Sequence, residues 1–334
     1  MRVRLAILAG AALLVAGQPL AAQPRPDVRQ YVEFALGQLK ARHINSARAD
    51  WTTIELEAES LLVHARDTRD ARKVIDHVLR RLGEKHSFIF HPEEAAEHRK
   101  NAAEQGDLPV ASSAGHDDGL PTGYLRDGAV AHLTLPGPSI SAGGQELFDA
   151  YATTLRQHVE ELAPQARCGW IIDLRNNYGG GMWPMLWGMD PLLGDGPFGY
   201  FVARSGTIPW ARTSEGIMGA REIDRSLAPA FAVRHAAAPV AVLLSNRTVS
   251  AGEMAAVSLI GREGVRTFGQ PTAGYTTANV TEAMPDGARL VITVSKVADR
   301  TGEPVDGPLI PDREIPSDLA HEAAAAWLTA QCDG

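Results

Sequence analysis

The chain has 334 residues, of which 45% are hydrophobic and 22% are charged, as is ordinary for a soluble globular protein. Its formal net charge of -8 argues against a nucleic-acid partner, because the chain carries no basic field that could release counterions from phosphates. No Cys/His cluster has the spacing of zinc ligands, so we expect neither a metal site nor a cofactor.

The first 22 residues have the pattern of an export signal. A short positive region, Met1–Arg4, precedes an apolar run from Leu5 to Gly17, and small residues follow that a signal peptidase could cleave. The run is about 13 residues long against roughly 20 needed to cross a bilayer, so an uncleaved anchor or a buried helix is the weaker alternative. We expect residues 1–22 to be removed, leaving a periplasmic or secreted chain that begins near Gln23 and has no membrane span.

Residues 23–90 form the first predicted unit, an N-terminal helical cap. Apolar residues recur at three- and four-residue steps over 28–39 and again over 74–82, which is the spacing of amphipathic helices. Gly83 then ends the last of these helices. Residues 91–124 are charged and then small and polar, and we expect them to be a mobile connecting segment.

Residues 125–334 are predicted to form the catalytic α/β core. Apolar strands alternate with helical segments there, which indicates a layered core with mostly parallel strands. The predicted strands lie at 130–135, 169–174, 239–244, 265–269 and 288–297, and the predicted helices at 146–162, 251–260 and 321–329. The core also holds both cysteines, Cys168 and Cys332, for which one disulfide and two free thiols are open alternatives.

The turn Thr-Val-Ser-Ala-Gly-Glu at 248–253 follows a buried strand and opens a helix of small residues. A serine at a helix N-terminus lies where unpaired N–H groups favour negative charge. That position suits Ser250 as a nucleophile, with the Ala251 N–H as an oxyanion donor. The alternative is a capping box, in which Ser250 and Glu253 each accept the other's backbone N–H. Taken alone, the motif favours the cap.

A second constellation is the glycine run Gly179–Gly181, which follows the strand predicted at 169–174. Glycines let backbone N–H groups turn outward into an anion-binding concavity, so we expect a second oxyanion donor from Gly180 or Gly181. A plain turn is the alternative. Asp173 and Arg175, at the end of that strand, are expected to fix the loop rather than to act in catalysis.

Two further residues could complete a catalytic unit. His86 follows the glycine-ended helix, and histidine is the side chain best suited to proton transfer near neutral pH. The chain has 11 histidines, however, so a structural histidine is the simpler interpretation. Asp306 lies in a loop rich in proline and glycine and could orient a histidine as the third member of a triad, while a turn-capping role is its alternative.

The order of these motifs carries a family resemblance. Gly-Glu-Lys-His-Ser at 83–87, Asp-Leu-Arg-Asn-Asn-Tyr-Gly-Gly at 173–180, the serine turn at 248–253 and Val-Asp-Gly-Pro-Leu-Ile-Pro-Asp at 305–312 together resemble the tail-specific, or C-terminal processing, serine peptidase family. That family includes the tricorn protease core and the nisin-resistance protein. The resemblance covers roughly two thirds of the chain and implies a ClpP/crotonase-like spiral core.

The resemblance implies a nucleophile at Ser250, a general base at His86 and oxyanion donors on Ala251 and the glycine loop. Asp306 stands where many members have glutamate. Members with a Ser-Lys dyad carry a lysine in the loop after the serine, but no lysine occurs here between Ala251 and Val294. A Ser-His mechanism therefore fits better. Only about 40 residues separate His86 from the next core strand, too few for an inserted PDZ domain.

These features predict an exported serine endopeptidase that cleaves extended peptides or unfolded protein tails through an acyl-enzyme. The main alternative is a catalytically inactive peptide- or lipid-binding module on the same fold. A crotonase-type thioester enzyme is disfavoured, because the chain has an export signal and no nucleotide-binding motif. The last alternative is an exported structural protein with a well-capped helix at Ser250.

Overall fold

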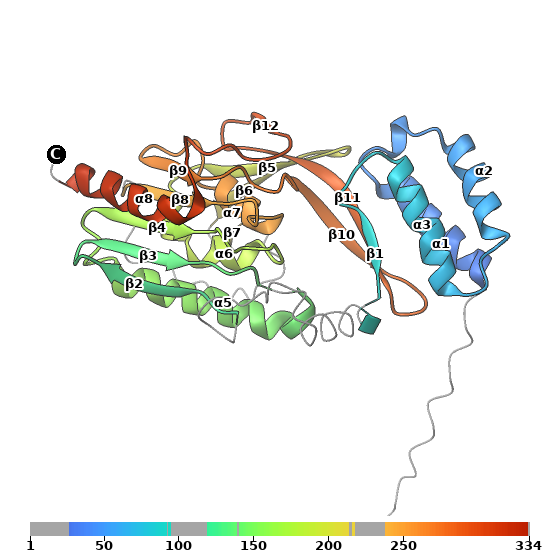
Figure 1. Cartoon of the computed structure of the whole chain (residues 1–334), viewed down its shortest axis with the longest axis horizontal. Helices are drawn as coiled ribbons and strands as arrows, with labels where there is room; N and C mark the ends of the chain where they lie inside the picture. Colours follow the sequence, from blue (N-terminus) through green and yellow to red (C-terminus); the bar gives the residue numbers. More distant parts are fainter. Residues whose placement is uncertain are drawn as a thin grey trace, which may run out of the picture.

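The computed structural model describes residues 27–91, 93–94, 119–138, 140–213, 216–217 and 238–332. The predicted signal at 1–22 and most of the predicted connecting segment at 91–124 lie outside these residues. The described chain forms a group of helices at one end, a long hairpin, and a core of two sheets with helices around them (Figure 1). Within these ranges no helix combines the length and the apolar character needed to cross a membrane.

Three helices make up the N-terminal cap: α1 (Val28–Arg42), α2 (Trp51–Leu62) and α3 (Thr68–Arg81), with a 3-10 turn, η1, at Ser46–Arg48. Each α-helix begins after an aspartate whose side chain accepts a backbone N–H of the first turn. The apolar faces of the helices pack together and against the tip of a β-hairpin that includes Met284 and Leu290. The predicted N-terminal helical cap is therefore confirmed.

The first sheet contains four of the five predicted strands, those at 130–135, 169–174, 239–244 and 265–269. Its order is β13 (Arg313–Glu314), β9 (Val265–Gly269), β8 (Val240–Leu244), β4 (Gly169–Asp173), β3 (Val130–Thr134) and β2 (Thr122–Arg126). All neighbouring pairs are parallel except β2 with β3. Because β2 begins at Thr122, the core starts slightly before the predicted boundary at 125.

Helices cover both faces of this sheet, so β4 and β8 are fully buried. Alternate residues of these strands, such as Trp170 and Val242, pack with α5 (Ile140–Leu162), α6 (Trp183–Gly188) and α7 (Ala251–Val257). The intervening residues pack against α8 (Ser317–Cys332). Because both faces of each strand are buried under helices, consecutive residues in β4 and β8 are apolar.

The second sheet is antiparallel throughout, and β11 is its one strand that was predicted, at 288–297. Its centre is β11 (Arg289–Ala298), which pairs with β1, β10, β5 and β12. A second hairpin continues the sheet from β5 to β6 and then to β7. The bounds are Phe88–Phe90 for β1, Thr277–Ala283 for β10, Pro197–Ala203 for β5, Gly206–Thr213 for β6, Gly216–Ile217 for β7 and Pro304–Val305 for β12; a 3-10 turn, η2, spans Asp190–Leu192.

The α/β class is confirmed, with one mostly parallel sheet and one antiparallel sheet. The long strand β11 reaches from the cap into the core and connects the two regions (Figure 1). Its partner β10 begins at Thr277, directly after the loop that follows β9. This arrangement places the 272–277 segment between the cap and the core.

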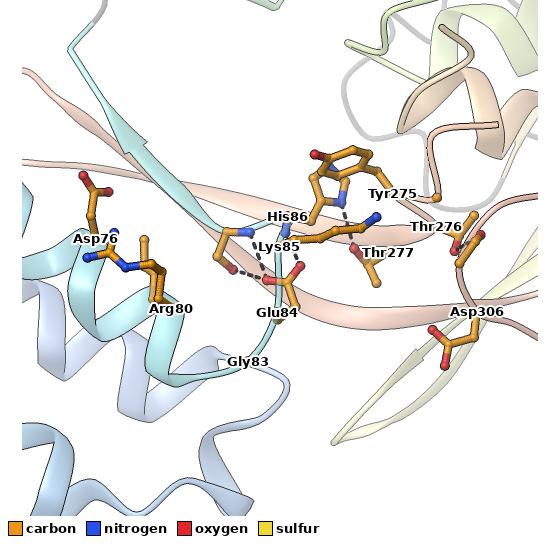
Figure 2. Close-up of a pocket in the computed structure, with 14 residues that line it drawn as sticks. Asp76, Arg80, Gly83, Glu84, Lys85, His86, Tyr275, Thr276, Thr277 and Asp306 are labelled. Atoms are coloured by element: carbon orange, nitrogen blue, oxygen red, sulfur yellow. Dashed lines mark hydrogen bonds between the residues drawn. The ribbon is translucent and has the colours of Figure 1, made fainter. Parts of the chain in front are cut away.

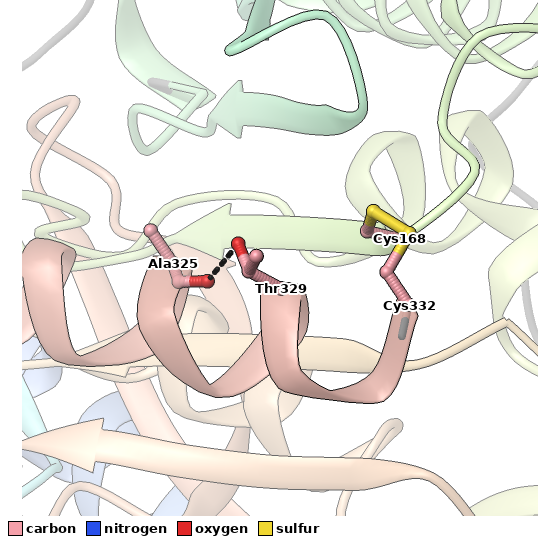
Figure 3. Close-up of a disulfide and its surroundings, with 4 residues drawn as sticks. All are labelled: Cys168, Ala325, Thr329 and Cys332. Atoms are coloured by element: carbon pink, nitrogen blue, oxygen red, sulfur yellow. Dashed lines mark hydrogen bonds between the residues drawn. A yellow bond between two sulfur atoms is a disulfide. The ribbon is translucent and has the colours of Figure 1, made fainter. Parts of the chain in front are cut away.

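Cys168 and Cys332 form a disulfide, which decides between the two alternatives that the sequence left open. Cys168 precedes β4, Cys332 ends α8, and their Cα atoms are 4.6 Å apart (Figure 3). The bond ties the last helix to the central strand of the parallel sheet. It links residues 164 positions apart in the sequence.

Candidate active site

Ser250 lies at a sharp turn between strand β8 and helix α7. Its backbone has φ +50° and ψ -111°, and Asp127 is the other described non-glycine residue with positive φ. This conformation is strained for an L-residue. It is held by hydrogen bonds on both sides of the turn, from the Gly252 N–H to the Val249 carbonyl and from the Met254 N–H to the Ser250 carbonyl. The geometry resembles the strained strand-to-helix turn that presents the nucleophile in other hydrolases.

The capping box expected from the motif is present, and its stronger half is the bond to Glu253. The Glu253 carboxylate accepts the Ser250 N–H at 2.8 Å. The Ser250 side chain faces the Glu253 backbone as in a capping box, but it makes no side-chain cap hydrogen bond of ordinary geometry. The hydroxyl therefore caps α7 only weakly.

The glycine loop packs directly against the serine turn. A Cβ atom on Gly179 would lie 3.2 Å from the Cβ atom of Ser250, and the Val249 N–H donates to the Asn177 carbonyl at 2.9 Å. A Cβ atom on Gly180 would lie 1.9 Å from the Pro138 carbonyl oxygen. Only glycine can occupy that position, where φ is +116°.

Some backbone N–H groups of the glycine loop already donate hydrogen bonds, and others do not. Gly179 donates to the Asn177 side chain at 3.0 Å, and Gly181 donates to the Pro138 carbonyl at 3.0 Å. Within the part of the chain that the structure describes, the N–H groups of Gly180 and Ala251 have no protein acceptor. One of these N–H groups follows Ser250 directly, and the other belongs to the loop that packs against it through Gly179. Free N–H groups near a serine are what an oxyanion hole requires. Gly181 is the predicted donor whose N–H is already taken.

His86 lines a pocket of about 630 Å³ between helix α3 and the 274–277 segment (Figure 2). The ring is buried, with the residue 7% exposed, and its Nδ1 atom lies 2.7 Å from the Thr277 Oγ1 atom. The ring also packs edge-to-face on Tyr275, with 5.1 Å between ring centroids. Burial lowers the pKa of His86 to about 4 in spite of the nearby Glu84 carboxylate. The imidazole is therefore neutral near pH 7, as a general base must be.

Glu84 fixes the turn that carries His86. Its carboxylate accepts the His86 N–H, and it accepts both the N–H and the hydroxyl of Ser87 at 2.9 and 2.7 Å. Burial would raise the pKa of Glu84, but these hydrogen bonds and the His43 ring nitrogen 3.7 Å away outweigh it and hold that pKa at about 2. The ionised carboxylate thus orders the backbone around the histidine.

The segment from Thr272 to Thr277 joins the serine and histidine halves of the site. The Glu253 carboxylate, which holds the Ser250 N–H, also accepts the N–H groups of Gly274 and Tyr275 at 2.7 and 2.8 Å. Tyr275 and Thr277 in turn contact the His86 ring. No hydrogen bond joins Ser250 to His86 directly among the described residues.

Asp306, which could have oriented a histidine as the third member of a triad, lies on the rim of the same pocket. It is placed away from the His86 ring (Figure 2). Its side chain is 82% exposed, and its carboxylate lies 3.5 Å from Lys296. The hydroxyl of Thr277 takes the position at Nδ1 instead. Thr277 was not among the predicted site residues, since a threonine in this position has no distinguishing sequence pattern.

Asp173 and Arg175 form a buried pair at the end of β4, with 2.6 Å between carboxylate and guanidinium. Burial would raise the pKa of Asp173, but hydrogen bonds from His132 and Arg175 outweigh it and hold that pKa well below its usual range. Arg175 also donates to the Ser317 carbonyl at 2.7 Å. These contacts fix the loop ahead of the glycines, as expected for this pair. In the described ranges no three His, Cys, Asp or Glu side chains are grouped closely enough to hold a metal ion.

Comparisons with known proteins agree with this geometry. The chain is 27% identical over 307 residues to the nisin-resistance protein of Lactococcus lactis subsp. lactis, covering 92% of this chain and 88% of that protein. It is 29% identical over 213 residues to a carboxyl-terminal-processing protease of Synechocystis, covering 58% of this chain and 45% of that protein. A lipoprotein structure from Streptococcus agalactiae superposes with a TM-score of 0.75 and 25% identity, over 94% of this chain and 100% of that one.

A family model matches residues 139–315, just over half of the chain. The match includes the glycine loop, the serine turn and the 272–277 segment. The resemblance that the four motifs carried is thereby confirmed, and the chain belongs to peptidase family S41.

Proposed function

We propose that this protein is an exported, active serine endopeptidase with Ser250 as its nucleophile and His86 as its general base. The observation that carries the proposal is the serine turn itself. Ser250 is held in a strained conformation, and the free N–H of Ala251 follows it directly. The glycine loop that carries the free Gly180 N–H packs against it through Gly179. A turn that served only to cap a helix would need neither the strain nor the free donors.

The chemistry follows from the protonation state of the histidine. With Nδ1–H donating to the Thr277 hydroxyl, the neutral ring keeps its lone pair on Nε2. Nε2 takes the Ser250 proton as the hydroxyl oxygen attacks the peptide carbonyl, and the two N–H groups bind the resulting oxyanion. Collapse of the intermediate breaks the C–N bond and Nε2–H protonates the leaving amine. Water then repeats the sequence and releases the acid from the acyl-enzyme.

The proposed substrates are extended peptides or unfolded protein tails. The pocket that His86 lines is open to such a chain, and main-chain hydrogen bonds to a strand would recognise it without a fixed side-chain sequence. One relative is by name a carboxyl-terminal-processing protease. The proposal of export rests on the pattern of residues 1–22 and on similarity to a protein described as a lipoprotein.

Alanine variants of the two proposed catalytic residues test this function. We expect Ser250→Ala and His86→Ala each to lower kcat for peptide hydrolysis by about 10⁴-fold or more, because members of such a unit act together. Lys296→Ala is the matched control, since Lys296 is the first lysine after the serine turn and lies on strand β11, outside the loop where a Ser-Lys dyad has its lysine. This variant should hydrolyse peptide at the wild-type rate. Hydrolysis by Ser250→Ala at the wild-type rate would refute the proposal. A wild-type protein that hydrolyses no peptide would favour the binding-module alternative.

A further inference from the structure

Glu253 is a fully buried carboxylate without a cationic partner in the described part of the chain. Burying a charge that no opposite charge compensates is unfavourable unless several hydrogen bonds stabilise it. A residue needed only to cap the N-terminus of α7 could remain at the surface. The burial of Glu253 therefore points to a role beyond the helix cap.

The hydrogen bonds of Glu253 divide evenly between its two oxygens. Oε2 accepts the N–H groups of Ser250 and Tyr275, both at 2.8 Å. Oε1 accepts the Gly274 N–H at 2.7 Å and the Thr272 hydroxyl. Only the bond from Ser250 belongs to the capping box, and the other three go to the segment that packs on His86.

This segment is itself held at both ends. Thr272 exchanges two hydrogen bonds with Leu309, through its N–H to the Leu309 carbonyl and through its hydroxyl from the Leu309 N–H. At the other end, Thr277 meets the His86 ring. A shift of the segment relative to α7 would therefore move the histidine relative to the serine.

We propose that Glu253 is a positioning residue, which sets the distance and orientation between Ser250 and His86 by binding the serine turn and the 272–275 segment with one carboxylate. The inference rests on the proposed Ser-His mechanism and adds the group that assembles it. Glu253 touches neither substrate nor transferred proton, so it acts through the two residues that it holds in place.

Replacement by glutamine has a defined consequence because the amide has one acceptor oxygen instead of two. If the NH₂ group replaces Oε2, the N–H groups of Ser250 and Tyr275 both lose their acceptor. If it replaces Oε1, the Thr272 hydroxyl can rotate to accept from it, and only the Gly274 N–H loses its acceptor. The second orientation is the less costly one, so Glu253→Gln should release the segment near the histidine and leave the serine turn capped.

The test is steady-state kinetics of the full chain with Glu253→Gln, with active sites titrated by a fluorophosphonate. We expect kcat per titrated site to fall by about 10²-fold, as for a misplacement of about 1 Å in an active site. KM should change little, because substrate binding is not involved. A purely structural role would lower the number of titrated sites and leave kcat per site at the wild-type value, which would overturn the inference.

Asp286→Asn is the matched control. Asp286 is a partly buried carboxylate at the tip of the hairpin that accepts hydrogen bonds from Tyr31, Arg72 and the Ala288 N–H. This variant loses comparable hydrogen bonds in the cap and should keep kcat per site. An equal loss of kcat per site in Asp286→Asn would overturn the specific role of Glu253.

If Glu253→Gln does not fold, Thr272→Val decides the question, because it removes one donor to the carboxylate and keeps the other three. It also removes the acceptor of the Leu309 N–H, while the Thr272 N–H still binds the Leu309 carbonyl. It should lower kcat per site by a smaller factor than Glu253→Gln is expected to, and a wild-type value would overturn the inference. Failure here is distinct from failure of the proposed function. If Ser250→Ala and His86→Ala are inactive while the Glu253 and Thr272 variants are fully active, the positioning role alone is wrong.

Discussion

The Oγ1 atom of Thr277 lies 2.7 Å from the Nδ1 atom of His86, in the position where a triad would have a carboxylate. Thr277 begins strand β10, so the antiparallel sheet fixes its backbone against β11. A hydroxyl can hold the ring and its tautomer, but it adds no negative charge to stabilise an imidazolium. Thr277 therefore orients the His86 ring but supplies no negative charge to it.

Thr277→Val tests this role. The valine side chain has nearly the same shape but cannot accept from Nδ1–H, so the ring loses the contact that orients it. We expect kcat to fall by about 10²-fold, at the low end of what acid–base catalysis contributes. Thr277→Ser should keep most of the activity in the same peptide assay.

Asp306→Asn is the control for that experiment. Its carboxylate is exposed and pairs with Lys296, and surface pairs of this kind contribute about 0–1 kcal/mol. Wild-type kcat is expected. A large loss in Asp306→Asn together with full activity in Thr277→Val would show that Asp306, as the family resemblance implies, orients the histidine.

Gly180→Ala should remove one of the two oxyanion donors. Its Cβ would meet the Pro138 carbonyl oxygen at 1.9 Å, so the loop must move and its free N–H must turn. Loss of one such donor lowers kcat by about 10²–10³-fold. Gly302→Ala is the control, because Gly302 also has positive φ but has open space around it. Peptide hydrolysis and unfolding curves of both variants separate backbone strain from loss of the donor, and equal activity in the two would contradict this assignment.

The pH dependence of kcat/KM should reflect the buried histidine. Because burial lowers the pKa of His86 to about 4, the ring stays neutral until the pH falls through that value, and activity should be lost there. An acid limb near the ordinary histidine pKa of about 6.5 would contradict this environment.

The same shift affects folding. The unfolded chain binds a proton to His86 more readily than the folded chain, so the stability that this group contributes is complete above about pH 6.5 and decreases as the pH falls toward 4. His86→Ala should show a shallower loss of unfolding free energy over this interval. An unchanged pH dependence in that variant would mean that the ring is not buried in the neutral form.

The disulfide is expected to stabilise the fold rather than the chemistry. A Cys168→Ser, Cys332→Ser double variant should lose about 2–4 kcal/mol of unfolding free energy, because the bond restricts a long loop in the unfolded chain. Its kcat at 25 °C should match the wild type. Chemical denaturation with and without reductant measures the effect, and identical midpoints for wild type and variant would contradict it.

The parallel sheet could be predicted from the sequence because its strands are buried on both faces. Ile171 and Val242, for example, belong to continuous apolar runs bounded by turns. Only β11 of the antiparallel sheet was predicted, because β5 and β6 mix proline, arginine and threonine with aromatic residues and show no clean alternation. β10, with residues such as Asn279, has the same mixed character.

In the site, the serine turn and the glycine loop could be located from the sequence because unusual backbone conformations require particular residue types. Gly180, with φ +116°, is one example. The partner of His86 could not be located, because a threonine hydroxyl has no sequence signature. Its contact depends on how β10 lies beside the 83–87 turn, which is a property of the tertiary fold. The role of Glu253 beyond the cap was hidden for the same reason.

Labelling with a serine-reactive fluorophosphonate, followed by mass spectrometry of the modified peptide, tests the central claim most directly. One adduct is expected, on Ser250, formed by the wild-type protein and lost in both Ser250→Ala and His86→Ala. An adduct on another serine, or none over the pH range in which the protein is folded, would contradict it.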